Sequence, residues 1–283
     1  MRALGKTPII FIHGAFCGGW SFDLFRRPFD KRGYRTLTPD LPHHEQGADV
    51  DALCQLGVCE YAAAIESLCS RLDQPPVLIG HSMGGLIAQI VASHRPIAGL
   101  ILLAPASPWG VWPTTTEETA ASLALYTMGD FWRRPVEPDY AAARQFALQN
   151  FTRDDALRLF ARMVPESGRA AFESIHWWRD SSMRSAAPVY LIESPVLAVA
   201  GGRDRLTPAP TIRRLAQRFP SDQATFVELP DMSHWLPAEP GWGRVAELCL
   251  DWLADKGVTA SPGGGLSRAM RAAISAAGSS PVR

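Results

Sequence analysis

Short runs rich in apolar and β-branched residues recur along this chain, separated by longer segments of mixed character. Where such a run is uninterrupted by polar residues, it is typical of a strand covered on both faces, as in a parallel sheet. We therefore predict six strands, at residues 8–12, 34–38, 77–80, 97–104, 195–200 and 224–229.

Helical patterns alternate with these runs. The segment 58–73 carries an apolar stripe at helical spacing, formed by Tyr61, Ala62, Ile65, Leu68, Cys69 and Leu72. Helices are also predicted at 84–94 and 242–254. Strands that alternate with helices indicate the α/β class, so we predict a mostly parallel, doubly wound sheet of about six strands.

A long segment without a strand pattern, residues 105–194, separates the fourth and fifth predicted strands. It holds five of the nine tryptophans, so it should bring aromatic surface to whatever it covers. Because so long a bare loop is uncommon in a compact domain, we expect a helical cap over the carboxyl edge of the sheet. The core would then comprise 1–104 and 195–256, and the Gly-, Ser- and Ala-rich segment 257–283 a flexible tail.

Composition narrows the class of protein. The 28 Lys and Arg balance the 28 Asp and Glu, so no net charge favours nucleic acid or an anionic membrane. No apolar run reaches the length of a membrane span, and residues 1–8 are too short and polar for a signal peptide. The five cysteines lack paired metal-ligand spacing, which predicts reduced thiols and a cytoplasmic location. Because His43, His44, His94 and His176 lack a carboxylate or cysteine pattern, no metal is expected, and no cofactor is expected either.

The most informative motif is Gly80-His81-Ser82-Met83-Gly84-Gly85, between the strand at 77–80 and the helix at 84–94. A strand that enters G-x-S-x-G and leaves as a helix forms a nucleophile elbow, which raises a serine hydroxyl above the sheet. The two motif glycines allow the strand and helix to approach closely while the serine adopts an unfavourable backbone conformation. Ser82 is therefore the candidate nucleophile.

A serine needs a base, and the base needs a group that orients it. His234 follows the last predicted strand and is the candidate base, and Asp204 follows the fifth and is the candidate acid. With Ser82, they all lie after strands, at the end of the sheet where open α/β folds place their sites. Two other carboxylates are weaker candidates: Asp40 precedes Ser82, and Asp231 lies close enough to His234 to bond locally.

The elbow, the order serine, aspartate, histidine, and the His13-Gly14 pair after the first strand together resemble capped serine hydrolases of the α/β-hydrolase fold. The resemblance covers about residues 8–255. It implies an oxyanion hole made by the backbone N–H of Ala15 or Phe16 together with that of Met83. The family usually begins with an antiparallel hairpin. Only eight residues precede Ile9 here, so we expect a six-stranded, essentially parallel sheet.

The sequence also predicts the roles of three further residues near these loops. His13 should brace the oxyanion loop, His81 should point away from substrate, and Cys17 should line the pocket.

The resemblance implies a carboxylesterase-like enzyme that cleaves an ester through an acyl-enzyme. Because binding pockets are lined mainly by apolar side chains, the aromatic cap favours a small-molecule ester with an apolar group. Trp20 and Trp235 lie beside the site loops and are the candidate substrate-binding residues. Thioesterase, lactonase and C–C bond hydrolase activities would use the same three residues, and a ligand receptor with little turnover is the alternative from another class.

Overall fold

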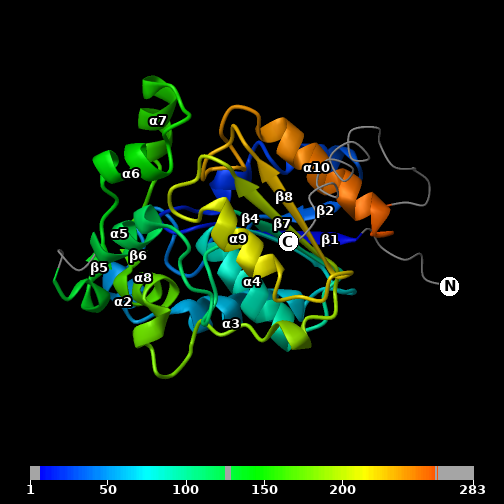
Figure 1. Cartoon of the computed structure of the whole chain (residues 1–283), viewed down its shortest axis with the longest axis horizontal. Coiled ribbons are helices and arrows are strands. Elements are labelled where there is room, and N and C mark those ends of the chain that lie inside the picture. Colours follow the sequence, from blue (N-terminus) through cyan, green and yellow to red (C-terminus); the bar gives the residue numbers. More distant parts are fainter. Residues whose placement is uncertain (1–6, 125–128, 259, 261–283) are drawn as a thin grey trace.

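The computed structural model describes residues 7–124, 129–258 and 260, and contains a six-stranded sheet in the order β2-β1-β3-β4-β7-β8 (Figure 1). Every neighbouring pair in it is parallel. The strands are β1 (Pro8–Ile12), β2 (Arg35–Leu37), β3 (Val77–His81), β4 (Gly99–Leu103), β7 (Val196–Gly201) and β8 (Ala224–Leu229). The predicted number and direction of the strands are confirmed.

Burial explains why some strands were easier to recognise than others. Every residue of β1, β3, β4 and β7 is buried, and these central strands are the uninterrupted apolar runs. The edge strands β2 and β8 are only partly covered. Their sequences mix polar and apolar residues accordingly, because one side of an edge strand faces solvent.

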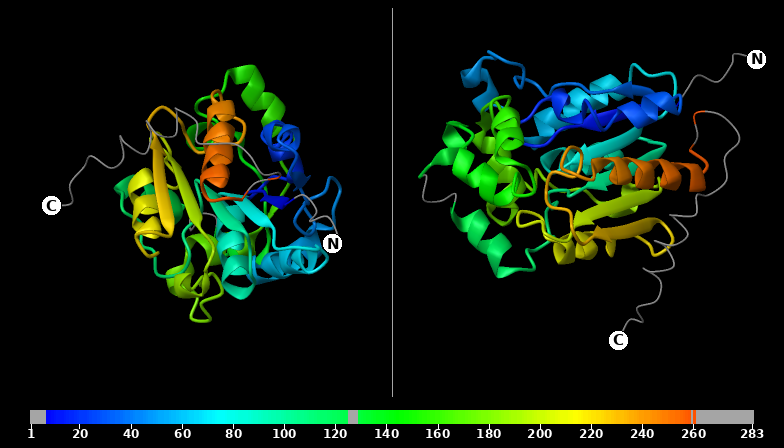
Figure 2. Two further views of the ribbon diagram at one scale, coloured as in Figure 1. Left: turned by 90° about the vertical axis from the view of Figure 1, so that its right-hand side faces the viewer. Right: turned by 90° about the horizontal axis from the view of Figure 1, so that it is seen from above.

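Helices cover both faces of the sheet (Figure 2). Side chains of β1 alternate between the faces: Ile10 and Ile12 pack with α3 (Val58–Cys69) and α4 (Met83–His94). The other face packs against α1 (Arg27–Lys31) and α10 (Trp242–Asp255). The predicted helix 58–73 ends at Cys69, four residues early. Four shorter elements of the core were not predicted: η1 (Gly19–Phe22), α1, α2 (Val50–Cys54) and α9 (Ala209–Ala216).

The segment 105–194, called the insertion below, lies at the edge of the sheet formed by the carboxyl ends of the strands (Figure 2). Its helices are α5 (Thr116–Ala124), α6 (Tyr140–Phe146), α7 (Arg153–Phe160) and α8 (Gly168–Ile175), with short turns η3 (Phe131–Arg133), η4 (Trp177–Arg179) and η5 (Val189–Leu191). It also contains an unpredicted antiparallel pair, β5 (Pro135–Val136) and β6 (Glu166–Ser167). Strands of two residues are too short to show an alternating pattern.

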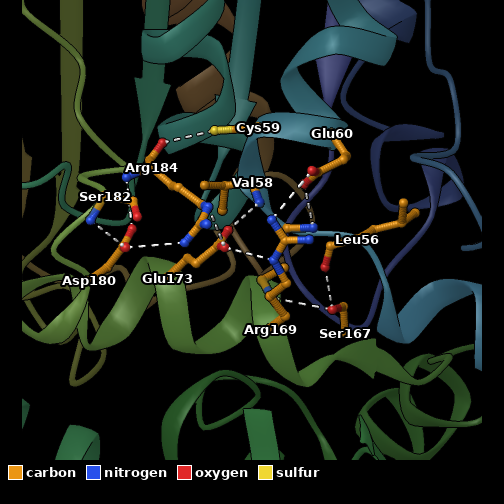
Figure 3. A network of polar contacts seen from close by, with 12 residues as sticks. Leu56, Val58, Cys59, Glu60, Ser167, Arg169, Glu173, Asp180, Ser182 and Arg184 are labelled. Carbon is orange, nitrogen blue, oxygen red and sulfur yellow. Dashed lines mark hydrogen bonds and ion pairs between the residues drawn. The ribbon is translucent and has the colours of Figure 1, made fainter. Parts of the chain in front are cut away.

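A polar network fastens the insertion to the core at the start of α3 (Figure 3). Gly57 precedes α3 and has no side chain to cap it. Glu173 of α8 accepts a hydrogen bond from the Val58 N–H at 2.9 Å. Arg169 donates to the same carboxylate at 2.9 Å and balances its charge. The first turn of α3 therefore receives one of its missing acceptors from the insertion.

The predicted tail, 257–283, lies outside the described residues except for Gly257, Val258 and Ala260. No helix among the described residues combines the length and apolar character needed to cross a bilayer.

Candidate active site

Ser82 occupies the turn between β3 and α4 with φ 53° and ψ −122°, a conformation that non-glycine residues rarely adopt. The turn is tight because its glycines allow close contact. A Cβ on Gly80 would overlap the backbone of Gly84, and one on Gly84 would overlap the carbonyl of Ile12. The Ser82 N–H donates to the Leu103 carbonyl at 3.1 Å. These contacts hold the serine at the carboxyl ends of β3 and β4.

The structure brings the three predicted residues Ser82, His234 and Asp204 into one hydrogen-bonded chain. His234 Nδ1 lies 2.8 Å from Asp204 Oδ2, and His234 Nε2 lies 3.0 Å from Ser82 Oγ. An ionised carboxylate only accepts, so Nδ1 carries the proton and Nε2 is free to accept from the hydroxyl. His234 and Asp204 are buried, and Ser82 is partly exposed.

Asp204 is held in place by its own loop. Its Oδ1 accepts from the N–H groups of Leu206 and Thr207 at 2.8 and 3.0 Å. The Thr207 hydroxyl lies 2.8 Å from Oδ2 and 3.1 Å from the Ala104 carbonyl. Sequence reasoning did not single out Thr207.

The two weaker candidate acids bond elsewhere. Asp40 accepts from the Gly19 N–H at 2.7 Å and thereby fixes the turn after β1. Asp231 is exposed and forms an ion pair with Arg244 at 2.5 Å. The hydrogen bond from Arg244 lowers the pKa of Asp231. Of the three candidate carboxylates, Asp204 is therefore the one that is hydrogen-bonded to His234.

Two buried side chains position the loop that carries His234. His81 Nε2–H donates to the His234 carbonyl at 2.9 Å, and its ring stacks on Trp235. Burial lowers the pKa of His81 to about 3, so this ring is neutral. Glu239 accepts from the N–H and hydroxyl of Ser233 at 2.7 and 2.6 Å. Neither contact was foreseen from the sequence.

His13 joins the loops after β1 and β2, a bracing contact of the kind expected from the sequence. Its Nδ1–H donates to the Gly14 carbonyl, and its Nε2 accepts from the Leu41 N–H, both at 2.9 Å. Burial, together with the charge of His44, lowers the pKa of His13 to about 3. A neutral ring is what this pattern of one donor and one acceptor requires.

The three predicted oxyanion donors come from two segments of the chain. Met83 directly follows Ser82 at the start of α4, and Ala15 and Phe16 follow β1. The Phe16 N–H is turned toward the insertion, where it donates to Glu166 Oε2 at 3.3 Å. Sequence reasoning did not single out Glu166.

Trp20 and Trp235, the predicted substrate-binding residues, lie where the core meets the insertion. Their ring centroids are 6.1 Å apart. Trp235 also packs edge-on against Phe151 of the insertion, and the Arg162 guanidinium lies 4.3 Å above Trp20. Cys17 belongs to the same apolar cluster, and burial raises the pKa of its thiol. The site loops are thus flanked by apolar and aromatic side chains.

All five cysteines are free thiols. Within the described ranges, no group of three or more His, Cys, Asp or Glu side chains is arranged to hold a metal ion.

Comparison with known proteins gives a consistent picture. A family model described as "Alpha/beta hydrolase family" matches residues 9–248. A pyrethroid hydrolase of Sphingobium wenxiniae is 36% identical over 112 residues, which span 38% of this chain and 40% of that protein. A pimeloyl-[acyl-carrier protein] methyl ester esterase of Neisseria meningitidis is 28% identical over 206 residues, 69% of this chain and 76% of that protein.

Among solved structures, a pyrethroid hydrolase from Sphingobium faniae superposes with a TM-score of 0.66. The match covers 88% of this chain and 97% of that one, at 24% sequence identity. At this level of identity the likeness concerns the fold.

The buried neutral histidines predict how stability depends on pH. The pKa of His13 and of His81 is about 3 in the folded protein and about 6.5 in an unfolded chain. Between these values the unfolded chain binds protons that the folded protein does not. The contribution of each of these two histidines to the free energy of unfolding should therefore be greatest above pH 6.5 and fall toward pH 3 by about 1 kcal/mol per pH unit.

His81→Gln should remove one of these two contributions. Urea unfolding of the wild type and the variant between pH 7 and 4.5 measures both slopes. We expect the variant's slope to be shallower by about 1 kcal/mol per pH unit, again the value for one histidine. Equal slopes would show that His81 is not held neutral by burial.

Proposed function

Because the chain belongs to the alpha/beta hydrolase family, we propose that it is a serine hydrolase that cleaves a carboxylic ester through an acyl-enzyme. Ser82 is the nucleophile, His234 the general base and Asp204 the acid that orients the base. The observation that carries the proposal is the hydrogen-bonded chain from Asp204 through His234 to Ser82, with links of 2.8 and 3.0 Å.

The first half of the reaction forms the acyl-enzyme. Ser82 Oγ attacks the ester carbonyl carbon while its proton passes to His234 Nε2. Asp204 stabilises the imidazolium that results. As the tetrahedral intermediate collapses, the imidazolium returns the proton to the departing alcohol. In the second half, a water molecule attacks the acyl carbonyl carbon while its proton passes to His234 Nε2. The bond between Ser82 Oγ and the acyl carbon then breaks, the imidazolium returns the proton to Ser82 Oγ, and the acyl group leaves as a carboxylic acid.

The oxyanion of each tetrahedral intermediate needs two aligned donors. We assign these to the backbone N–H groups of Ala15 and Met83. The hydrogen bond from the Phe16 N–H to Glu166 supports this choice, because it turns the alternative donor toward the insertion. Donors of this kind contribute about 3–4 kcal/mol each to transition-state stabilisation.

The substrate we propose is a small ester with an apolar group. Trp20 and Trp235 flank the site loops, and α6 and α7 of the insertion add further apolar side chains to their cluster. The relatives named for hydrolysis of pyrethroids and of a pimeloyl methyl ester support the same class of bond. In this account the insertion, 105–194, is a cap on a core formed by 1–104 and 195–256.

The proposed chemistry needs no cofactor or metal, since every proton is carried by a side chain of this chain or by water. The five free thiols support a cytoplasmic location, where cysteines remain reduced.

Replacement of the nucleophile tests the proposal directly. Ser82→Ala removes one partly exposed oxygen, so the fold should persist while kcat for p-nitrophenyl butyrate falls about 10⁴-fold or more. Circular dichroism and thermal unfolding serve as the control for folding. A variant that kept a tenth of wild-type activity would exclude Ser82 as the nucleophile.

Three aspartate variants separate the proposed acid from its competitors. Asp204→Asn keeps the shape of the side chain but favours the wrong imidazole tautomer, so kcat should fall by about 10⁴-fold. Asp40→Asn and Asp231→Asn should retain most of the activity, because these carboxylates bond to Gly19 and Arg244. If Asp204→Asn were nearly silent and either of the other variants were inactive, the assignment of the acid would be wrong.

A matched pair of tryptophan variants tests the apolar acyl or alcohol site. Trp20→Ala should raise KM for p-nitrophenyl octanoate several-fold while changing that for the acetate little, since only a long chain reaches an apolar wall. Trp112→Ala is the control, because Trp112 is 54% exposed and stacks within a separate group of insertion tryptophans. Similar chain-length profiles for both variants would show that Trp20 does not line the site.

A further inference from the structure

Glu166, in the insertion, is a fully buried carboxylate that contacts the loop after β1, which carries Ala15 and Phe16. Its Oε1 accepts from the Tyr61 hydroxyl at 2.9 Å and from the Ser167 N–H at 2.8 Å. Its Oε2 lies 3.0 Å from His44 Nε2 and 3.3 Å from the Phe16 nitrogen. Four donors from four segments of the chain therefore meet on one side chain.

The buried charge of Glu166 is matched by His44. The second ring nitrogen of His44, Nδ1, lies 3.1 Å from the Pro42 carbonyl, which can only accept. With a carboxylate on one side and a carbonyl on the other, both ring nitrogens donate, and the ring is an imidazolium. Burial alone would lower the pKa of His44, but the charge and hydrogen bond of Glu166 outweigh it and the pKa is raised.

Both backbone polar groups of Phe16 are hydrogen-bonded to this part of the insertion. Its N–H donates to Glu166, and its carbonyl accepts from the Val164 N–H at 3.0 Å. Phe16 has φ 63°, a left-handed conformation that is unfavourable for a bulky residue. Such a conformation persists where the surrounding contacts fix it. Together, Glu166 and Val164 supply those contacts.

We propose that Glu166 is a positioning residue for the oxyanion hole: it holds Phe16, and so aims the N–H of the preceding residue, Ala15, at the developing oxyanion. The inference rests on the proposed function. It gives the insertion a part in building the oxyanion hole in addition to covering the site. His44 supplies the counter-charge that makes a carboxylate tolerable in this buried position.

The size of the effect follows from what one donor contributes. Removal of an oxyanion donor typically lowers kcat by about 10²- to 10³-fold. Loss of Glu166 leaves the Ala15 N–H present but free to turn away. The expected loss in kcat is smaller, about 10- to 100-fold, with little change in ground-state binding.

Glu166→Gln and Glu173→Gln form a matched pair for the test. Both carboxylates are buried, come from the insertion and accept backbone N–H groups of the core. A glutamine has one acceptor oxygen, so at position 166 it cannot satisfy both pairs of donors. With p-nitrophenyl butyrate, we expect Glu166→Gln to lower kcat 10- to 100-fold and to keep KM within about twofold. Glu173→Gln should leave both constants within about twofold, because the backbone N–H that it accepts, that of Val58, lies at the start of α3.

A second readout separates positioning from general damage. A trifluoromethyl ketone forms a tetrahedral adduct on the serine, so its Ki should rise in Glu166→Gln by the factor that kcat/KM falls. Butyrate, the product, should bind as it does to the wild type. Wild-type kcat/KM in Glu166→Gln, or parallel losses of ketone and butyrate affinity, would overturn the proposal.

His44→Gln provides the same test should Glu166→Gln fail to fold. Its amide keeps one N–H donor for Glu166 but removes the positive charge, so a smaller loss of kcat at constant KM is expected. An unchanged kcat would overturn the proposal. A wild-type protein that turned over no ester and gave no organophosphate label on Ser82 would instead contradict the proposed function.

Discussion

The backbone conformation of Ser82 is the constraint on which the rest of the site depends. A residue with φ 53° is stable only where its neighbours leave no alternative. Here the Ser82 N–H donates to Leu103, and its carbonyl accepts from the Ala106 N–H at 2.8 Å. Because β3 and α4 are buried along nearly all of their length, the turn between them cannot relax without disturbing the core. The hydroxyl is thereby fixed at one point above the sheet, and the other groups are arranged around it.

Those other groups lie on loops that are joined to one another by hydrogen bonds from buried polar side chains. His81 of β3 holds the loop of His234, and Thr207 links the loop of Asp204 to the end of β4. The parallel register makes these links possible, since it brings the carboxyl ends of β3, β4, β7 and β8 side by side. These hydrogen bonds fix the positions of loops whose sequences carry no regular pattern.

Much of this arrangement was predictable from the sequence, and the remainder was not, for identifiable reasons. The central strands are recognisable because they are apolar throughout, and Ser82 and Asp204 each follow one of them. His234 follows the edge strand β8, whose sequence is mixed. The contact between Phe16 and Glu166 joins residues 150 positions apart, and β6 is too short to carry a pattern. For that reason the sequence left Ala15 and Phe16 as equal alternatives. The choice between them depends on a partner from the insertion that no local pattern reveals.

The central claim is that Ser82 carries the acyl group during turnover, and trapping the acyl-enzyme tests it most directly. A p-nitrophenyl ester of trimethylacetic acid suits the experiment, because the bulky acyl group slows deacylation. The wild-type protein is quenched in acid during turnover, digested and analysed by mass spectrometry. The account predicts the added acyl mass on the peptide that contains Ser82, together with a burst of one p-nitrophenolate per protein. A burst with the acyl group on another residue, such as Cys17, or steady turnover with no covalent adduct, would contradict it.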